Sequence, residues 1–407
     1  MRDNHATHTG RTAGRPLSVP EAGTGTDPAG SAEAGLHLSE TVITLPDDYE
    51  GRVIATLVSA EIAPDAPLNA PPVPGTRPDG PVEVFPGDKA GASEAAARGM
   101  DDCSDDRRTA GPADADHAGA SPARSGTGQA VLYIHGYIDY FFQYHMAAAF
   151  NAAGYNFYAL DLRKYGRSIL PGQTPYYCRD LHEYYPEIDR AIELVIGRGN
   201  SRIALLGHST GGLIASLYMN DGTYRASIGR LVLNSPFLEY NTGWFKRRVA
   251  IPVSAVVGRV FPYAHKRNEL SPHYTASVHA SMRGEWNFDL RLKPLDGVPL
   301  YFAWLGAVRR GHLRVKRGLG ITVPILLMHS SCSTTSRRWD ESYTRCDGVL
   351  DVRDISRYGR RLGSDVTDIA VAGGLHDLVL SRREVRDEVL RLMIAWLGAE
   401  PPGPTGR

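Results

Sequence analysis

A serine between small residues carries the strongest chemical signal in this 407-residue sequence. Ser209 lies in the run Gly207–Gly211, after the apolar stretch 203–206 and before an amphipathic stretch. The pattern G-x-S-x-G needs small residues around the serine because the backbone turns sharply there from a strand into a helix. The dipole of the following helix favours negative charge at this turn. We therefore predict that Ser209 is a catalytic nucleophile.

A histidine late in the chain has the position of a general base. His376 follows Gly373 and Gly374, directly after the last predicted strand, 366–371. A general base must reach the serine hydroxyl, and two glycines give its loop the freedom to do so. The chain has 14 histidines, so most must be bystanders. The order serine, acid, histidine along the chain favours His376.

The acid that would orient this histidine is marked less clearly. It should follow the apolar stretch 323–329, but residues 330–336 contain no carboxylate. We predict Asp347, because residues 347–351 begin a turn into a helix, which suits an acid that fixes His376. Asp351 is the second candidate, and the other acids of this segment are Asp340, Glu341 and Asp354.

Acyl transfer also needs two N–H donors directed at the developing oxyanion. One is expected from Thr210, the residue after the nucleophile. The other is expected from Tyr137, in the loop after the apolar stretch 130–134. The neighbouring His135 is predicted to satisfy loop carbonyls rather than to take part in catalysis. This set of groups requires neither a metal nor an organic cofactor.

From residue 129 onward, stretches typical of strands alternate with stretches typical of helices. Repeated strand–helix–strand units predict a mostly parallel, doubly wound sheet, whose strand ends would bring these residues together. A β-hairpin is predicted over 39–59, and an amphipathic helix over 383–397. The predicted parallel strands are 130–134, 155–160, 202–206, 230–234, 323–329 and 366–371, and the helices between the first four are 141–153, 181–196 and 210–220.

Composition separates one catalytic domain, 39–400, from segments of different character. Residues 1–38 lack hydrophobic periodicity and are predicted to be a disordered tail. Residues 64–128 are rich in Pro, Ala, Gly, Asp and Arg, so they bury too little apolar area to offset conformational entropy. We expect them to form a disordered insertion. Residues 236–320 interrupt the alternation and are predicted to form a cap or lid over the carboxyl ends of the strands.

Charge and hydropathy exclude several classes of partner. The 45 Lys and Arg balance the 45 Asp and Glu, which argues against nucleic acid. Without a secretory signal or an apolar stretch long enough to span a bilayer, a cytoplasmic location is expected. Contact with a membrane surface through apolar groups is compatible with this composition. Nothing in the sequence defines an oligomeric state.

The four cysteines match neither a zinc site nor a dense disulfide framework. In a reducing cytoplasm, Cys103, Cys178, Cys332 and Cys346 are expected to be free thiols. The alternative is a disulfide between Cys332 and Cys346, which bracket a loop.

Four motifs together resemble those of the serine aminopeptidase-like, monoacylglycerol lipase-like α/β-hydrolases, which include lysophospholipases. The resemblance extends over residues 40–400 without the insertion, and it implies the α/β-hydrolase fold. The motifs are His135-Gly136, Asp161-Leu-Arg-Lys-Tyr-Gly-Arg-Ser168, Gly207-His-Ser-Thr-Gly211 and Gly374-Leu-His-Asp377.

The resemblance also implies roles for individual residues. It assigns Ser209 and His376 to catalysis and the backbone amides of Tyr137 and Thr210 to the oxyanion hole. It further implies that Asp161 and Arg167 hold a structural loop. The acid position of the family falls at Ser333, whereas a similar pattern recurs around Asp347.

These observations predict a serine hydrolase that cleaves a carboxylic ester of a lipid-like or small acyl substrate through an acyl-serine intermediate. A serine nucleophile argues against dehalogenases and epoxide hydrolases, which use an aspartate at this position of the fold. An aminopeptidase is a second hypothesis, and its amine-binding carboxylate would be Glu239, Glu269 or Glu285. A non-catalytic ligand-binding protein on the same fold is the third.

Overall fold

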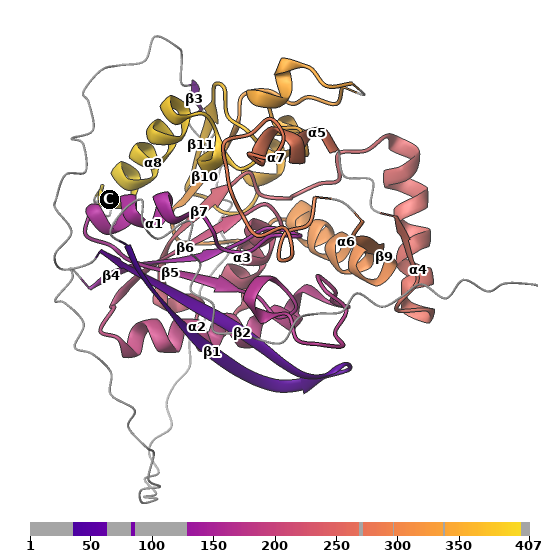
Figure 1. Cartoon of the computed structure of the whole chain (residues 1–407), viewed down its shortest axis with the longest axis horizontal. Helices are drawn as coiled ribbons and strands as arrows, with labels where there is room; N and C mark the ends of the chain where they lie inside the picture. Colours follow the sequence, from indigo (N-terminus) through magenta and orange to yellow (C-terminus); the bar gives the residue numbers. More distant parts are fainter. Residues whose placement is uncertain are drawn as a thin grey trace, which may run out of the picture.

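The computed structural model describes residues 36–62, 83–85, 128–267, 272–295, 297–336 and 338–399. A nine-stranded sheet in the order β1-β2-β5-β4-β6-β7-β10-β11-β3 forms its centre (Figure 1). The six strands from β5 to β11 are parallel, and antiparallel strands lie at both edges. The strands are β1 (Leu36–Asp48), β2 (Gly51–Ile62), β3 (Glu83–Phe85), β4 (Gln129–Ile134), β5 (Asn156–Asp161), β6 (Arg202–His208), β7 (Ile228–Asn234), β10 (Ile325–Ser330) and β11 (Val366–Val371).

Helices cover both faces of this sheet because its central strands are apolar on both sides. In β6, Ile203 and Leu205 pack into one buried cluster, and Ala204 and Leu206 pack into the other. This is the pattern expected of a parallel, doubly covered sheet. Within the described residues, no helix is both long and apolar enough to cross a bilayer. One face is covered by α1 (Tyr144–Ala152) and α8 (Arg383–Gly398), and the other by α2 (Tyr185–Gly197), α3 (Thr210–Asp221) and α7 (Val352–Gly359).

The segment between β7 and β10, which contains residues 236–320, does not continue the alternation of sheet strands and helices. Its described residues form a second, two-stranded sheet, a π-helical turn at Lys246–Ala250 and three α-helices. In Figure 1 its helices α4 and α6 lie side by side at one side of the molecule, and they pack against each other. Its elements are α4 (Ile251–Val260), β8 (His265–Arg267), α5 (Pro272–Val278), β9 (Pro299–Tyr301) and α6 (Phe302–Arg317).

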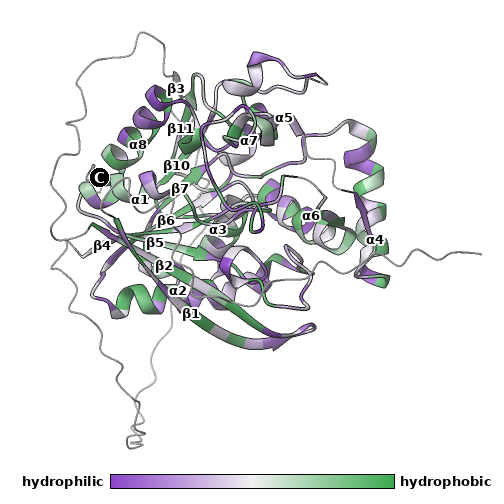
Figure 2. Cartoon of the chain, in the orientation of Figure 1, coloured by the Kyte–Doolittle hydropathy of each residue, from purple (hydrophilic) through white to green (hydrophobic). Residues whose placement is uncertain are grey.

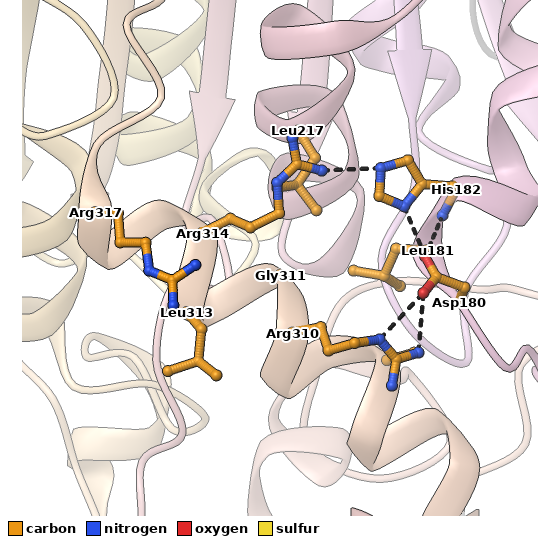
Figure 3. Close-up of a pocket in the computed structure, with 10 residues that line it drawn as sticks. Asp180, Leu181, His182, Leu217, Arg310, Gly311, Leu313, Arg314 and Arg317 are labelled. Carbon is orange, nitrogen blue, oxygen red and sulfur yellow. Dashed lines mark hydrogen bonds and ion pairs between the residues drawn. The ribbon is translucent and has the colours of Figure 1, made fainter. Parts of the chain in front are cut away.

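Helix α6 is fixed to the core of the domain by close packing and by charge. A Cβ on Gly311 would lie 3.1 Å from Leu217 of α3, so the two helices approach closely. Beside this contact, Arg310 lies 3.0 Å from Asp180, and Arg314 lies 2.8 Å from the ring of His182 (Figure 3). These pairs line a shallow depression of about 270 Å³ between α6 and the core.

Two predicted boundaries need correction. The predicted tail 1–38 extends too far, because β1 begins at Leu36, which is buried and pairs with Ile62. The predicted insertion 64–128 is not wholly irregular, because Glu83–Phe85 forms β3 against β11. An open sheet edge presents unpaired backbone groups, which a short strand can satisfy even when the surrounding composition is poor. The remaining residues of both segments lie outside the described residues, except Gly128.

Candidate active site

Ser209 lies at the turn between β6 and α3, with φ of 52° and ψ of −117°. A positive φ is rare for a residue with a side chain and marks a strained backbone. The turn also brings three segments close together. A Cβ on Gly211 would lie 2.3 Å from the carbonyl oxygen of Ile134, and one on Gly207 would lie 2.7 Å from that of Gly211. Packing therefore requires both glycines of the predicted motif.

The three side chains predicted as a triad lie in hydrogen-bond contact. Nε2 of His376 is 3.0 Å from Oγ of Ser209, and Nδ1 of His376 is 2.9 Å from Oδ2 of Asp347. All three residues are buried. The ring of Tyr274 packs edge-on at 5.5 Å from the ring of His376. The structure thus brings the three predicted residues together in one hydrogen-bonded chain.

The second oxygen of Asp347 fixes the carboxylate in this orientation. Oδ1 accepts hydrogen bonds from the backbone N–H groups of Val349 at 2.7 Å and Leu350 at 2.8 Å. The backbone N–H of Asp347 donates to Cys332 at 2.9 Å, and its carbonyl accepts from Thr334 at 2.8 Å. The acid is therefore held after the end of β10 by backbone groups of residues that are distant in the sequence from Ser209 and His376.

A disulfide joins Cys332 to Cys346 beside this acid, with a Cα–Cα distance of 4.9 Å. The expectation of free thiols was wrong for these two residues, because the loop folds back and pairs the segments on which they lie. Cys178 is a buried free thiol, and Cys103 lies outside the described residues. Disulfides are typical of oxidising compartments, so this pair does not support the predicted cytoplasmic location.

The other acids of this segment are engaged elsewhere. Asp351 caps α7 by accepting from the backbone N–H of Arg353 at 3.0 Å, and it also pairs with the side chain of that arginine. Asp340 accepts from the backbone N–H of Ser342 at 2.8 Å. Asp354 forms an ion pair of 3.2 Å with Arg247, and Glu341 lies 3.9 Å from Arg382.

The loop after β4 carries one predicted oxyanion donor, Tyr137, and the first residue of α3 is the other, Thr210. A Cβ on Gly136 would lie 3.2 Å from Cβ of Ser209, so the backbone of this loop passes directly over the serine. Tyr137 and Thr210 both line the cavity above it. Among the described residues, neither of their backbone N–H groups has an acceptor. The His135 ring instead lies 2.8 Å from the carbonyl of Gly136, as predicted for a structural histidine.

A cavity of about 860 Å³ opens over Ser209 and His376. The interrupting segment supplies much of its wall, and so does the loop that holds Asp347. The size and apolar character of this wall fit a substrate with a hydrophobic chain. Its apolar lining residues include Val278, Phe288, Leu295, Val298, Leu300, Phe302, Trp304 and Leu305.

Several buried polar residues near the site were not predicted. Asp139, His208 and Asp377 gather beside Ser209 and His376, with their possible ligand atoms within 4.8 Å of one another. His208 and Asp377 are direct neighbours of the two motif residues, which is a signal that the sequence did offer. Their mutual approach had no signal, because it depends on how three separate loops meet.

The order of the strands, the strained turn at Ser209 and the histidine after the last strand define an α/β-hydrolase. A family model described as serine aminopeptidase, S33, matches residues 126–338, more than half of the chain. The protein belongs to this family of hydrolases.

Individual relatives agree with this assignment. A monoacylglycerol lipase of Mycolicibacterium smegmatis is 33% identical over 135 residues, which make up 32% of this chain and 45% of the lipase. The chain thus matches about half the length of that relative. The fold resembles a monoglyceride lipase of Saccharomyces cerevisiae (TM-score 0.52, 16% identity, 68% of this chain and 88% of that one). It also resembles a monoacylglycerol lipase of Paleococcus ferrophilus (TM-score 0.50, 22% identity, 66% and 93%).

Proposed function

We propose that the protein is a serine hydrolase that cleaves the carboxylic ester of a lipid-like acyl substrate through an acyl-serine intermediate. The observation that carries this proposal is the continuous hydrogen-bonded chain from Ser209 through His376 to Asp347 at the floor of a largely apolar cavity. The likeness of the chain to a monoacylglycerol lipase supports the choice of an ester.

In the first half of the reaction, Oγ of Ser209 attacks the ester carbonyl carbon while its proton passes to Nε2 of His376. Asp347 accepts the Nδ1–H and stabilises the imidazolium. The N–H groups of Tyr137 and Thr210 donate to the oxyanion. The tetrahedral intermediate then collapses, and the alcohol leaves with the proton from His376. A water molecule repeats these steps on the acyl-serine and releases the acid.

A fluorophosphonate probe tests the nucleophile. It should label wild-type protein at Ser209, and Ser209→Ala should not be labelled. p-Nitrophenyl esters of increasing chain length, assayed beside aminoacyl anilides, then test the substrate class. Absence of labelling in the wild type would contradict the chemistry, whereas faster turnover of anilides would contradict only the choice of ester.

The aminopeptidase alternative finds less support among the described residues. Its amine-binding carboxylate should face the cavity, but Glu239 is buried in ion pairs with Lys316 and Arg247. Glu285 forms an ion pair of 3.1 Å with Arg386. Neither glutamate lines the cavity. The third candidate, Glu269, lies outside the described residues. The intact hydrogen-bonded triad likewise gives no support to a non-catalytic protein.

We further propose that the segment 236–320 is a cap whose helix α4 meets an anionic lipid surface. Residues 244–263 contain no Asp or Glu but include Lys246, Arg248 and Arg259. Figure 2 shows hydrophobic residues along α4 at the outer edge of the molecule. An apolar face with cationic flanks is typical of helices that lie in a membrane interface. The exposed apolar residues are Trp244, Phe245, Val249, Val253, Val256, Val260, Phe261 and Tyr263.

Ile251 and Ser254 of the same helix line the cavity, and so does Ala250, which directly precedes the helix. A lipid held at the outer face would therefore have a short path to Ser209. Wild-type protein should cosediment with vesicles that contain phosphatidylglycerol, and Val253→Ser/Val256→Ser should bind them less. Val42→Ser, an equally exposed valine on β1, serves as the control. Wild-type protein that remains in the supernatant would contradict this part of the proposal.

A further inference from the structure

A lysine of the cap reaches into the floor of the site. Lys293 lies between α5 and β9, and its Nζ is 2.7 Å from Oδ1 of Asp139 in the loop after β4. The side chains are 15% and 3% exposed, so water screens this ion pair little. The ammonium also lies over the rings of Phe142 at 4.8 Å and Phe288 at 5.1 Å. These contacts fix the charge of Lys293 at one position.

Asp139 needs this cation because it is part of a buried acidic cluster. The carboxylate of Asp377 and the ring of His208 lie within 4.8 Å of it. Burial lowers the pKa of His208 and therefore favours its neutral form. Burial alone would raise the pKa of Asp377, but the charge of Lys293 and hydrogen bonds from Asn234 and Gln143 outweigh it and lower the pKa. The positive charge of Lys293 thus compensates the negative charges of two neighbouring carboxylates, Asp139 and Asp377.

The cluster lies beside the catalytic groups, and Asp139 and His208 line the same cavity as Ser209 and His376. His208 precedes Ser209, Asp377 follows His376, and the rings of His208 and His376 are 5.0 Å apart. On the oxyanion side, Asp139 follows Ile138, whose φ of 52° marks a strained backbone that its surroundings must hold in place. Any displacement of Asp139 would therefore reach the predicted N–H donor only two residues away.

A second contact between the cap and this loop lies nearby. The ring of Trp304, in α6, packs against the ring of Tyr137 with centroids 4.0 Å apart. Two parts of the cap thus contact the loop between β4 and α1, one through an aromatic ring and one through a charge. Because the ion pair is buried, removing its cation would leave an uncompensated carboxylate, which is strongly unfavourable.

We infer that Lys293 is a positioning residue that holds the oxyanion loop through Asp139, so that the site is competent only when the cap is seated on it. The inference rests on the proposed function. Lys293 touches neither the serine nor the histidine, and its effect on the reaction passes through the loop. Because the oxyanion forms only in the transition state, loss of this support should lower kcat more than it raises KM.

The test compares four variants on a soluble p-nitrophenyl ester. Lys293→Met should lower kcat by about 10- to 100-fold with KM changed less than about threefold, in the range seen when an oxyanion donor is lost. Lys293→Arg keeps the charge and should retain kcat within about tenfold. D139N/K293M removes both charges and should recover at least about tenfold over Lys293→Met. Lys316→Met is the matched control, because it removes another cap lysine from a buried carboxylate, Glu239, away from the loop.

A readout independent of activity is amide hydrogen exchange in the peptide that spans 136–143. Exchange there should be faster in Lys293→Met than in Lys316→Met and should be slowed again in D139N/K293M. Unchanged kcat in folded Lys293→Met, or a double variant no better than it, would overturn the inference. If Lys293→Met does not fold, a folded K293R or D139N/K293M variant with kcat reduced more than about 100-fold would overturn it as well. A wild-type protein without esterase activity or labelling would overturn the proposed function instead, while the exchange data would still decide the structural link.

Discussion

The floor of the site and the outer face of the cap are built on opposite principles. At the floor, Ser209, His376 and Asp347 are buried and each is held by hydrogen bonds to another element. On the outer face, Val253 and Val256 of α4 are 57% and 63% exposed. The floor excludes water from its polar groups, whereas the cap leaves apolar groups in contact with water.

This difference indicates what each region does. Buried and hydrogen-bonded polar groups keep one geometry, and catalysis requires that the reacting groups be held precisely in place. Contact with water is unfavourable for exposed apolar groups, and their transfer to an apolar surface lowers the free energy. Substitutions should therefore have their largest effects at the floor, and the effects should decrease toward the outer face of the cap.

The largest effect is expected for Asp347→Asn. The asparagine oxygen would accept the N–H groups of Val349 and Leu350, as Oδ1 does now. Its NH₂ would then face Nδ1 of His376, which would have to accept and so place its proton on Nε2, toward Ser209. That tautomer cannot take the serine proton. We expect kcat to fall by at least about 10²-fold, toward the 10⁴-fold loss known for a triad acid, with folding intact.

Neighbouring carboxylates provide the controls for this prediction. Asp340→Asn, Asp351→Asn and Asp354→Asn should each lose less than about tenfold, because they remove local hydrogen bonds only. Steady-state kinetics and circular dichroism on all four variants decide the question. A folded Asp347→Asn with nearly wild-type kcat would show that another group orients His376.

The next effect concerns the disulfide at the edge of the floor. C332S/C346S opens a loop with a sequence separation of 14 and should lower the free energy of unfolding by about 3 kcal/mol. Activity should fall less than in Asp347→Asn, because Val349 and Leu350 still donate to the acid. Thermal unfolding with and without reductant measures the first effect. Alkylation of both cysteines in protein purified without reductant would contradict the presence of the bond.

Sequence reasoning predicted the catalytic residues in part, and of the cap it predicted only the extent, 236–320, and none of the contacts. Ser209 and His376 stand in local motifs, because a sharp turn and a loop end each need particular neighbours. Asp347 could be inferred only from the turn that follows it. Lys293 carried no signal, since its partner Asp139 is 154 residues away.

The same reasoning predicted the sheet well and the disulfide poorly. Continuous apolar runs such as 130–134 and 203–206 indicate strands, because both faces of a parallel sheet are buried. β3 has only three residues in a segment of unfavourable composition, so no periodicity could reveal it. Cys332 and Cys346 were judged by the expected compartment, whereas their pairing depends on how the loop folds back.

A smaller effect is expected where the cap joins the core, at His312 of α6. Its Nε2–H donates to the carbonyl of Phe237 at 2.8 Å. Burial lowers the pKa of His312 to about 4, although Glu239 opposes the shift. A histidine whose pKa is lower in the folded state binds its proton first in the unfolded chain. It therefore contributes stability above pH 6.5, and this is lost as the pH falls through 6.5 toward 4.

For His312, this loss amounts to about 2 kcal/mol at pH 5. His312→Gln keeps a donor for Phe237 but does not titrate, so its free energy of unfolding should fall less between pH 7 and pH 5. Urea unfolding at both pH values measures the difference. His265→Gln, at an exposed histidine, should retain the wild-type pH dependence. Equal pH dependence in wild type and His312→Gln would show that this histidine accepts a proton in the folded protein.

The smallest effect is expected at the outer face of the cap, when no lipid surface is present. Val253→Ser/Val256→Ser changes side chains that already contact water, so the free energy of unfolding should change by less than about 0.5 kcal/mol per site. Turnover of a short, water-soluble ester should stay within about twofold of wild type, because neither valine lines the cavity. Val308→Ser is the matched substitution in α6, where the side chain is fully buried. It should lower the free energy of unfolding by at least about 1 kcal/mol, since it places an unpaired hydroxyl in the core.

If the two α4 substitutions reduced the turnover of a soluble ester as strongly as they reduced vesicle binding, α4 would have to act on the reaction itself. The contrast between a floor that fixes the chemistry and a face that meets the lipid would then be lost.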